Sequence, residues 1–182
     1  MVLCSKRFIA TLVASLTEEV VIRGWILHLR ELARTTFIVV KDCSGEVQCV
    51  VASELVRELK LKLDEPLEVI GKIKPDKRAK LGFEVEVIEI NVLNSVSILP
   101  FNSSSDISDI SVETIVAYRP LSLRHSDIGD IFRIQAAILQ YFRQFLGARY
   151  FTEIVTSKIV SSGTEGGTNL FESPKSKATN SY

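Results

Sequence analysis

The sequence predicts a β-rich protein: a five-stranded barrel, then a hinge, then the first helix and strand of an α+β domain. Five short runs rich in β-branched and aromatic residues, separated by turn signals, lie between Glu19 and Leu99. A polar, turn-rich segment follows over 99–116, and an amphipathic helical pattern over 126–148 leads into an apolar run. The chain of 182 residues, 46% of them hydrophobic, is long enough for one or two domains.

The five runs have the length of strands, and one helix interrupts them. Asp42–Gly45 is a hairpin signal between the second and third runs, and 83–90 alternates apolar residues with glutamates. After the third run, Leu55, Leu59 and Leu63 recur at four-residue spacing and predict one helical face. The predicted strands, in chain order, are VVIRGWILHLR, TTFIVVKD, EVQCVV, PLEVIGKI and FEVEVIEINVL.

Three strands, a helix and two more strands is the order of the OB-fold, a Greek-key barrel that binds oligonucleotides on one face. A small barrel or sandwich with another ligand remains the alternative. We expect the segment before the first strand to lean on this barrel as a helix or strand.

The second half is expected to open a larger domain, because a helix and one strand cannot form a core. The helix has an apolar face that needs a partner surface, and a strand is expected over Phe151–Val160, followed by a Gly-rich turn over 163–167. The tail after Glu172 is polar and is expected to be disordered. The apolar face comprises Ile131, Ile134, Ile138, Phe142 and Phe145.

Charge and cysteine content exclude several classes of protein. The 22 basic and 22 acidic residues balance, so only a local patch could attract nucleic acid. The three cysteines, Cys4, Cys43 and Cys49, lack metal-site spacing, which predicts reduced thiols in a cytosolic protein without a metal site. We expect neither a signal peptide nor a membrane span.

One local patch is a basic loop between the fourth and fifth strands. Clustered cations bind phosphate backbones by releasing condensed counterions, although a solvated hairpin tip has the same composition. Only Asp76 opposes the cations within the run. The basic loop comprises Lys72, Lys74, Lys77, Arg78 and Lys80.

Two further sets of residues have chemistry suited to a ligand. Phe37 and Gln48 can project from one face of a hairpin, where a ring stacks on an unpaired base and an amide bonds its edge. The alternative places Phe37 in the core, as it does Trp25, and Gln48 in solvent. Glu165 precedes two glycines, which suits a carboxylate in a lid over a cationic group, or a simple exposed turn.

Together these residues resemble the aspartyl- and asparaginyl-tRNA synthetases of class II, from about Val20 to Phe171. The first half is similar to their N-terminal anticodon-binding domain, and the second half to the start of their catalytic domain with its first motif and mobile loop. The matching segments are Gly24-Trp25, Phe37, Asp42 to Gln48, Ala79 to Glu84, Arg119 to Arg124, Ile131 to Ile134, Phe151 to Val160 and Thr164 to Phe171.

The resemblance implies a role for each matching residue. Phe37 would stack on an anticodon base, while Gln48 and Glu84 would hydrogen-bond base edges. Glu165 would close over the amino-acid substrate. The long helix and the first-motif strand would form a homodimer interface, although Ser157 replaces a proline that shapes this contact in the family. Phosphates of the tRNA would be held by Arg23, Arg30 and the basic loop.

The resemblance also divides the chain and limits its chemistry. It implies an OB-fold over 1–99, a hinge over 100–118, a truncated catalytic domain over 119–171 and a disordered tail over 172–182. The complete family uses ATP and Mg²⁺, but the second and third motifs, which grip ATP, are absent. We therefore expect no catalytic residues, no bound cofactor and no adenylation by this chain.

The expected function is that of the N-terminal part of a cytoplasmic aspartate–tRNA ligase, which binds the tRNA anticodon. The alternatives are a fragment of an asparagine–tRNA ligase, an aspartate enzyme that charges both tRNAs, and a stand-alone OB-fold module that binds nucleic acid without catalysis.

Overall fold

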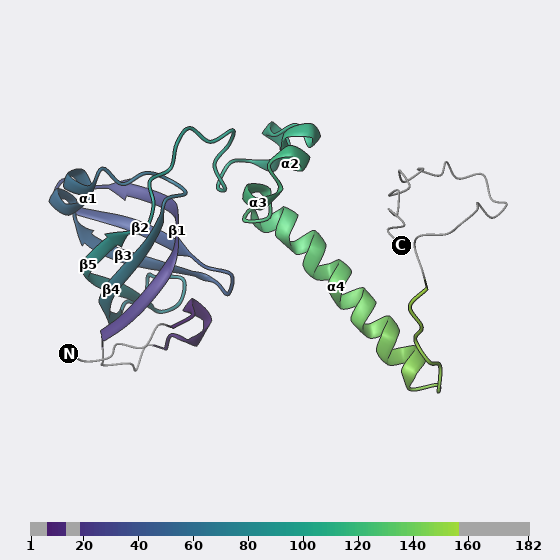
Figure 1. Cartoon of the computed structure of the whole chain (residues 1–182). Helices are drawn as coiled ribbons and strands as arrows, with labels where there is room; N and C mark the ends of the chain where they lie inside the picture. Colours follow the sequence, from purple (N-terminus) through teal and green to yellow (C-terminus); the bar gives the residue numbers. More distant parts are fainter. Residues whose placement is uncertain (1–6, 14–18, 157–182) are drawn as a thin grey trace, which may run out of the picture. The chain divides into compact units, whose positions relative to one another are not determined.

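The computed structural model describes residues 7–13 and 19–156. Their contacts divide into two compact units, 1–134 and 135–182, each of which is described by itself. The first unit contains the barrel and the segments that follow it (Figure 1). The barrel part comprises η1 (Ile9–Thr11), β1 (Glu19–Glu31), β2 (Thr35–Lys41), β3 (Glu46–Ala52), α1 (Ser53–Leu59), β4 (Pro66–Pro75) and β5 (Phe83–Val92).

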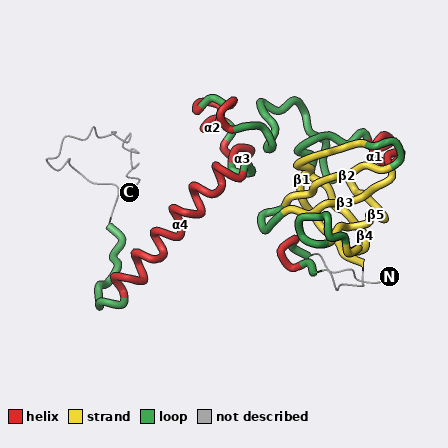
Figure 2. The backbone as a smooth tube through the Cα atoms, turned by 180° about the vertical axis from the view of Figure 1, so that it is seen from behind, coloured by secondary structure: helices red, strands yellow, loops and turns green. Residues whose placement is uncertain are grey.

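The five strands close into a barrel in the order β1-β2-β3-β5-β4 (Figure 2). All neighbours are antiparallel except β3 and β5, which are parallel. The long β1 pairs with β4 through its first half and with β2 through its second half, so this one strand completes the closure. The predicted five-stranded OB-fold is confirmed, including the helix between the third and fourth strands.

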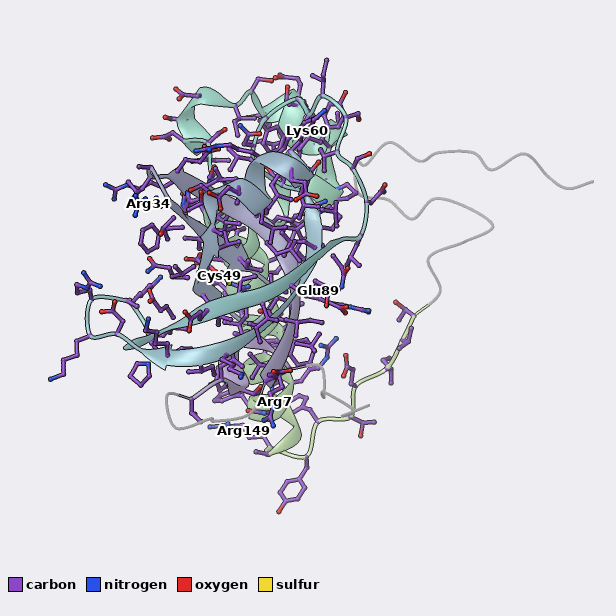
Figure 3. The ribbon with its side chains drawn as sticks, turned by 90° about the vertical axis from the view of Figure 1, so that its left-hand side faces the viewer. Arg7, Arg34, Cys49, Lys60, Glu89 and Arg149 are labelled. Carbon is purple, nitrogen blue, oxygen red and sulfur yellow. The ribbon has the colours of Figure 1, made fainter. Side chains whose placement is uncertain are left out.

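Strict alternation places one set of side chains inside the barrel. In β2 and β3 every second residue is buried, as expected where one face of a sheet covers a core. Cys49 lies within this core (Figure 3), where burial raises the pKa of its thiol to about 12 and keeps it protonated. Cys43 is exposed in the β2–β3 turn, and both thiols are free.

Short helices cover the two ends of the barrel (Figure 1). At one end, α1 buries Val56 against the core and stops at Leu59, because Lys60 adopts a left-handed conformation that ends the helix. The prediction that Leu63 continues the helical face is therefore wrong: it follows in the turn, although it still packs on the core.

At the other end, the N-terminal segment leans on the barrel as the short helix η1. Ile9 joins the core, and its backbone N–H donates to Asp42 Oδ2 at 2.9 Å. The other oxygen of Asp42 accepts from the backbone N–H groups of Ser44 and Gly45, which fixes the predicted hairpin turn. One carboxylate thus holds both the turn and η1.

After the barrel, the expected hinge contains short helices, and the long helix follows. Its apolar face is solvent-exposed, with the five predicted positions between 55% and 62% exposed. No helix within the described ranges has the length and apolar character needed to cross a membrane. The elements are η2 (Ile107–Asp109), α2 (Val112–Ala117), α3 (Arg119–Ser122) and α4 (Ser126–Gly147).

The strand expected from Phe151 does not form over 151–156, which have no regular secondary structure. A strand needs a neighbour to pair its backbone N–H and C=O groups, and none lies beside this segment within the described residues. An ion pair between Arg143 and Glu153, at 2.9 Å, joins the segment to α4 instead. The rest of the predicted strand, 157–160, lies outside the described residues.

Barrel closure should be sensitive to a single methyl group at Gly71. A Cβ there would lie 2.5 Å from the carbonyl oxygen of Glu86 on β5, a backbone atom that cannot move cheaply. We expect Gly71→Ala to lower the free energy of unfolding by about 1–3 kcal/mol, measured by urea denaturation. Gly147→Ala is the control, since no atom lies within 4 Å of its Cβ position. Equal midpoints for Gly71→Ala and the unmodified protein would contradict this tight contact.

Candidate nucleic-acid interface

Phe37 and Gln48 lie on one outer face of the barrel. In β2 and β3 they occupy the half-exposed positions that alternate with the buried core residues. Phe37 pairs with Val50 and Gln48 with Val39, so the two side chains are diagonal neighbours across the hairpin. Phe37 is therefore not a core residue, and its ring is available to a ligand.

Glu84 joins the same face from β5. The strand pairs in parallel with β3, which brings the carboxylate beside Gln48, and Gln48 Nε2 donates to Glu84 Oε2 at 3.1 Å. Glu84 is only 7% exposed. Three adjacent strands thus present a ring, an amide and a carboxylate together, and this set of Phe37, Gln48 and Glu84 is called the reading face below.

Arg30 extends this face on the β1 side. It is exposed and is the direct cross-strand partner of Phe37. His28, also exposed, pairs with Val39 on the same side of the sheet. His28 was not among the predicted site residues, although the alternation of β1 after the bulge between Ile26 and His28 would have placed it outward.

Several cations of the basic loop lie beside acidic residues that are distant in the sequence. Lys80 pairs with Glu46 at 3.6 Å and Lys72 with Glu19 at 3.7 Å. In the register of β4 and β5, Lys74 lies opposite Glu84. The loop therefore carries less net positive charge than its composition suggests.

Arg78 and Asp76 form the tightest pair of the loop. Arg78 Nη2 lies 2.7 Å from Asp76 Oδ2, and the backbone N–H of Arg78 also donates to this carboxylate at 2.9 Å. These hydrogen bonds lower the pKa of Asp76 to about 2, so the carboxylate stays ionised even in mildly acidic solution. The adjacent Lys77 is exposed at the tip.

The remaining predicted residues lie elsewhere. Arg23, on the first half of β1, donates from Nε to Glu68 Oε2 at 2.6 Å on the neighbouring β4. Its guanidinium is half-exposed and already has an anionic partner. Glu165, Ser157 and the Gly-rich loop over 164–171 lie outside the described residues.

The reading face has the chemistry to bind an unpaired base. Phe37 offers a stacking platform, Gln48 offers amide groups for a base edge, and Glu84 accepts hydrogen bonds. Arg30 and Lys77 supply exposed positive charge for a phosphate backbone. This combination of stacking groups and cations is typical of proteins that bind single-stranded nucleic acid.

Two family models match consecutive parts of the chain. Residues 20–93 match the family described as "OB-fold nucleic acid binding domain". Residues 111–182 match the family described as "tRNA synthetases class II (D, K and N)". The first match covers the barrel, and the second begins just before α2.

Several relatives similar to most of this chain are named as aspartate–tRNA ligases. The chain is 35% identical over 161 residues to the "Aspartate--tRNA(Asp/Asn) ligase" of Methanococcus maripaludis, which covers 85% of this chain and 36% of the relative. It is also 35% identical over 155 residues to the enzyme of the same name from Deinococcus radiodurans, covering 85% of this chain and 35% of the relative. The chain thus spans about a third of the length of these relatives.

A solved structure agrees with both parts. Asparaginyl-tRNA synthetase from Pyrococcus horikoshii, complexed with asparaginyl-adenylate, matches with a TM-score of 0.76 and 27% identity. The match covers 85% of this chain and 37% of the synthetase. The OB-fold barrel, the class II segment after it and these relatives together show that the chain belongs to the class II aspartyl- and asparaginyl-tRNA synthetase family and corresponds to its N-terminal part.

Proposed function

We propose that the barrel of this chain binds the anticodon of a tRNA on the reading face. The observation that carries the proposal is the convergence of the partly exposed Phe37 and Gln48 and the largely buried Glu84 from three strands onto one side of the sheet. Phe37 stacks on a base, and Gln48 and Glu84 bond base edges. Arg30 and the exposed end of the basic loop hold neighbouring phosphates, while Arg23 contributes only when it leaves Glu68.

The longer protein to which this chain corresponds is proposed to be a cytoplasmic ligase that joins aspartate to tRNA. The relatives named above support aspartate, and their names include both tRNA(Asp) and tRNA(Asn). Likeness to an asparaginyl-tRNA synthetase supports asparagine as the second candidate. The proposed division is an OB-fold over 1–99, a hinge over 100–118, a class II part over 119–171 and a tail over 172–182, with Glu165 over the amino acid.

ATP and Mg²⁺ belong to complete members of this family, in which ATP would activate the carboxyl group of the amino-acid substrate. The described residues include no cluster of three His, Cys, Asp or Glu side chains suited to a metal ion. Anticodon binding is the activity that the barrel can provide.

A homodimer is proposed for the exposed helix α4. Its apolar face extends along most of the helix, from Ile131 to Phe145, and each of its five positions is more than half exposed. Apolar surface of this extent on a helix marks an interaction site. A second copy of the chain presents the same face and can cover it.

The anticodon proposal is tested at Phe37. We expect Phe37→Ala to weaken binding of a tRNA(Asp) transcript by about 1–3 kcal/mol, because the stacking platform is removed. Filter binding measures the affinity, and Phe37→Tyr should retain most of it. Ile88→Ala, which truncates an exposed apolar residue on β5, is the matched control and should bind normally. Unchanged affinity for Phe37→Ala would remove the reading face from the proposal.

The role of the basic loop is tested at Lys77. Lys77→Gln removes an exposed cation without releasing Asp76 from Arg78. If Lys77 neutralises one phosphate, the slope of log K against log salt should become shallower by about 0.7 in this variant. Lys62→Gln, an exposed lysine just after α1, is the control. If the two variants show the same slope as the unmodified chain, the loop does not hold phosphate.

The dimer is tested on α4. Ile138 is 62% exposed, and a charge at this position should prevent apolar association. Sedimentation velocity should therefore show a concentration-dependent dimer for the unmodified chain and a monomer for Ile138→Glu. Gln140→Glu adds the same charge at a polar position of the same helix and should leave the dimer intact. Identical masses for all three proteins would contradict the dimer.

A further inference from the structure

Arg124, in the segment 119–124 that has no part in the reading face, contacts two residues of the barrel part. The guanidinium carbon of Arg124 lies 4.7 Å from the centroid of the Trp25 ring on β1. Arg124 Nη1 also lies 4.0 Å from Asp64 Oδ1. An aromatic ring and a carboxylate of the barrel thus both contact one cation.

The carboxylate of Asp64 interacts with residues that follow the barrel in the sequence. Asp64 is 1% exposed, and its own backbone N–H donates to the carbonyl of Ile26 at 2.8 Å. Its carboxylate accepts from the backbone N–H of Ser103 at 2.9 Å and also from the hydroxyl of Ser103. A buried carboxylate is costly without such partners. Ser103 and Arg124 supply them from two places along the chain.

Two further contacts tie down the connecting segment. His125, 7% exposed, accepts from the backbone N–H of Asp127 at Nδ1, so its Nε2 carries the hydrogen and donates to the carbonyl of Ser105 at 2.8 Å. Nearer the barrel, the buried Glu65 accepts from the backbone N–H of Val96 at 3.4 Å. The connection between barrel and α3 is therefore held by directional polar bonds.

We propose that Arg124 is a positioning residue that latches the start of the class II part onto the anticodon-binding barrel. Its guanidinium group stacks on Trp25 and faces Asp64, which also holds Ser103; these four residues are called the latch. The inference concerns the free protein and holds whether or not the barrel binds tRNA.

A cavity beside the latch supports this assignment. Its volume is about 230 Å³, so the space around Arg124 is not filled by side chains. The guanidinium group of Arg124 therefore borders open space on one side, while Trp25 and Asp64 contact it from the barrel. The cavity is lined on the barrel side by Lys41, Asp42 and Cys43, and on the other side by Leu123, Gly129 and Arg133, among others.

The latch can be observed directly because Trp25 is the single tryptophan of the chain. Acrylamide quenching of its fluorescence reports how often the ring is uncovered, and a urea midpoint reports whether the barrel remains folded. Three variants of the full chain are compared: Arg124→Gln, which removes the cation, Arg124→Lys, which keeps it, and Arg133→Gln. Arg133→Gln is the control, because Arg133 lines the same cavity but donates a hydrogen bond to Asp130, at 2.7 Å.

Loss of the cation–π interaction in Arg124→Gln should raise the population with an uncovered ring by roughly two- to five-fold. The quenching constant should rise and the emission maximum should move to longer wavelength, with an unchanged urea midpoint. Arg124→Lys should keep part of the protection of the Trp25 ring from acrylamide. Arg133→Gln should keep all of it. Unchanged quenching in Arg124→Gln, or an equal rise in Arg133→Gln, would overturn the latch.

A second measurement needs no variant that risks misfolding. In the unmodified chain, the ring current of Trp25 should shift the side-chain protons of Arg124 upfield in NMR spectra. Ordinary chemical shifts for these protons would contradict the latch whatever the variants show. Because neither measurement uses tRNA, failure of the latch is distinguishable from failure of anticodon binding.

Discussion

Closure of the barrel depends on the close approach of backbones at two glycines. At Gly24 and Gly71, any side chain would meet the carbonyl oxygen of the neighbouring strand. Both positions lie where strands pair with β1 or β5, the strands that bring the two ends of the sheet together. Closure decides which side chains of β2, β3 and β5 point outward. The reading face therefore exists only because these backbones can touch.

Long-range electrostatic attraction contributes little to the binding of a nucleic acid at this surface. The chain has no net charge, and much of the basic loop is paired with acidic side chains. At physiological salt, charges separated by more than about 8 Å are largely screened. A nucleic acid is therefore attracted mainly by short-range contacts, and shape and stacking at Phe37 matter more than a long-range field.

Secondary structure was predictable from the sequence wherever it depends on residues that are close together along the chain. Runs of β-branched and aromatic residues identified β2 and β3, the Asp42 turn identified their hairpin, and three- and four-residue spacing identified α4. The same spacing failed at Leu63, because a single left-handed residue, Lys60, ends α1 before the pattern does. The spacing of apolar residues indicates which side chains share a helical face. It does not indicate the backbone conformation of a single residue such as Lys60.

The candidate site was predictable only in part. The residue types of Phe37 and Gln48 pointed to a base, but a phenylalanine in a strand is more often a core residue and a glutamine is more often solvated. Contacts between distant segments, such as Lys80 with Glu46, follow from the closure of the barrel and have no local signal. The contact of Arg124 with Trp25 belongs to the same class, since it joins residues about a hundred positions apart.

The hydrogen bond from Gln48 to Glu84 has a consequence for conformational entropy. A free glutamine on a strand samples several rotamers, and immobilising it on binding costs on the order of 1 kcal/mol. In this protein the buried carboxylate holds the amide before any ligand arrives, so much of this cost is met during folding. The surface beside Phe37 is therefore preorganised, and contact energy at Gln48 goes into affinity and selectivity instead of ordering the side chain.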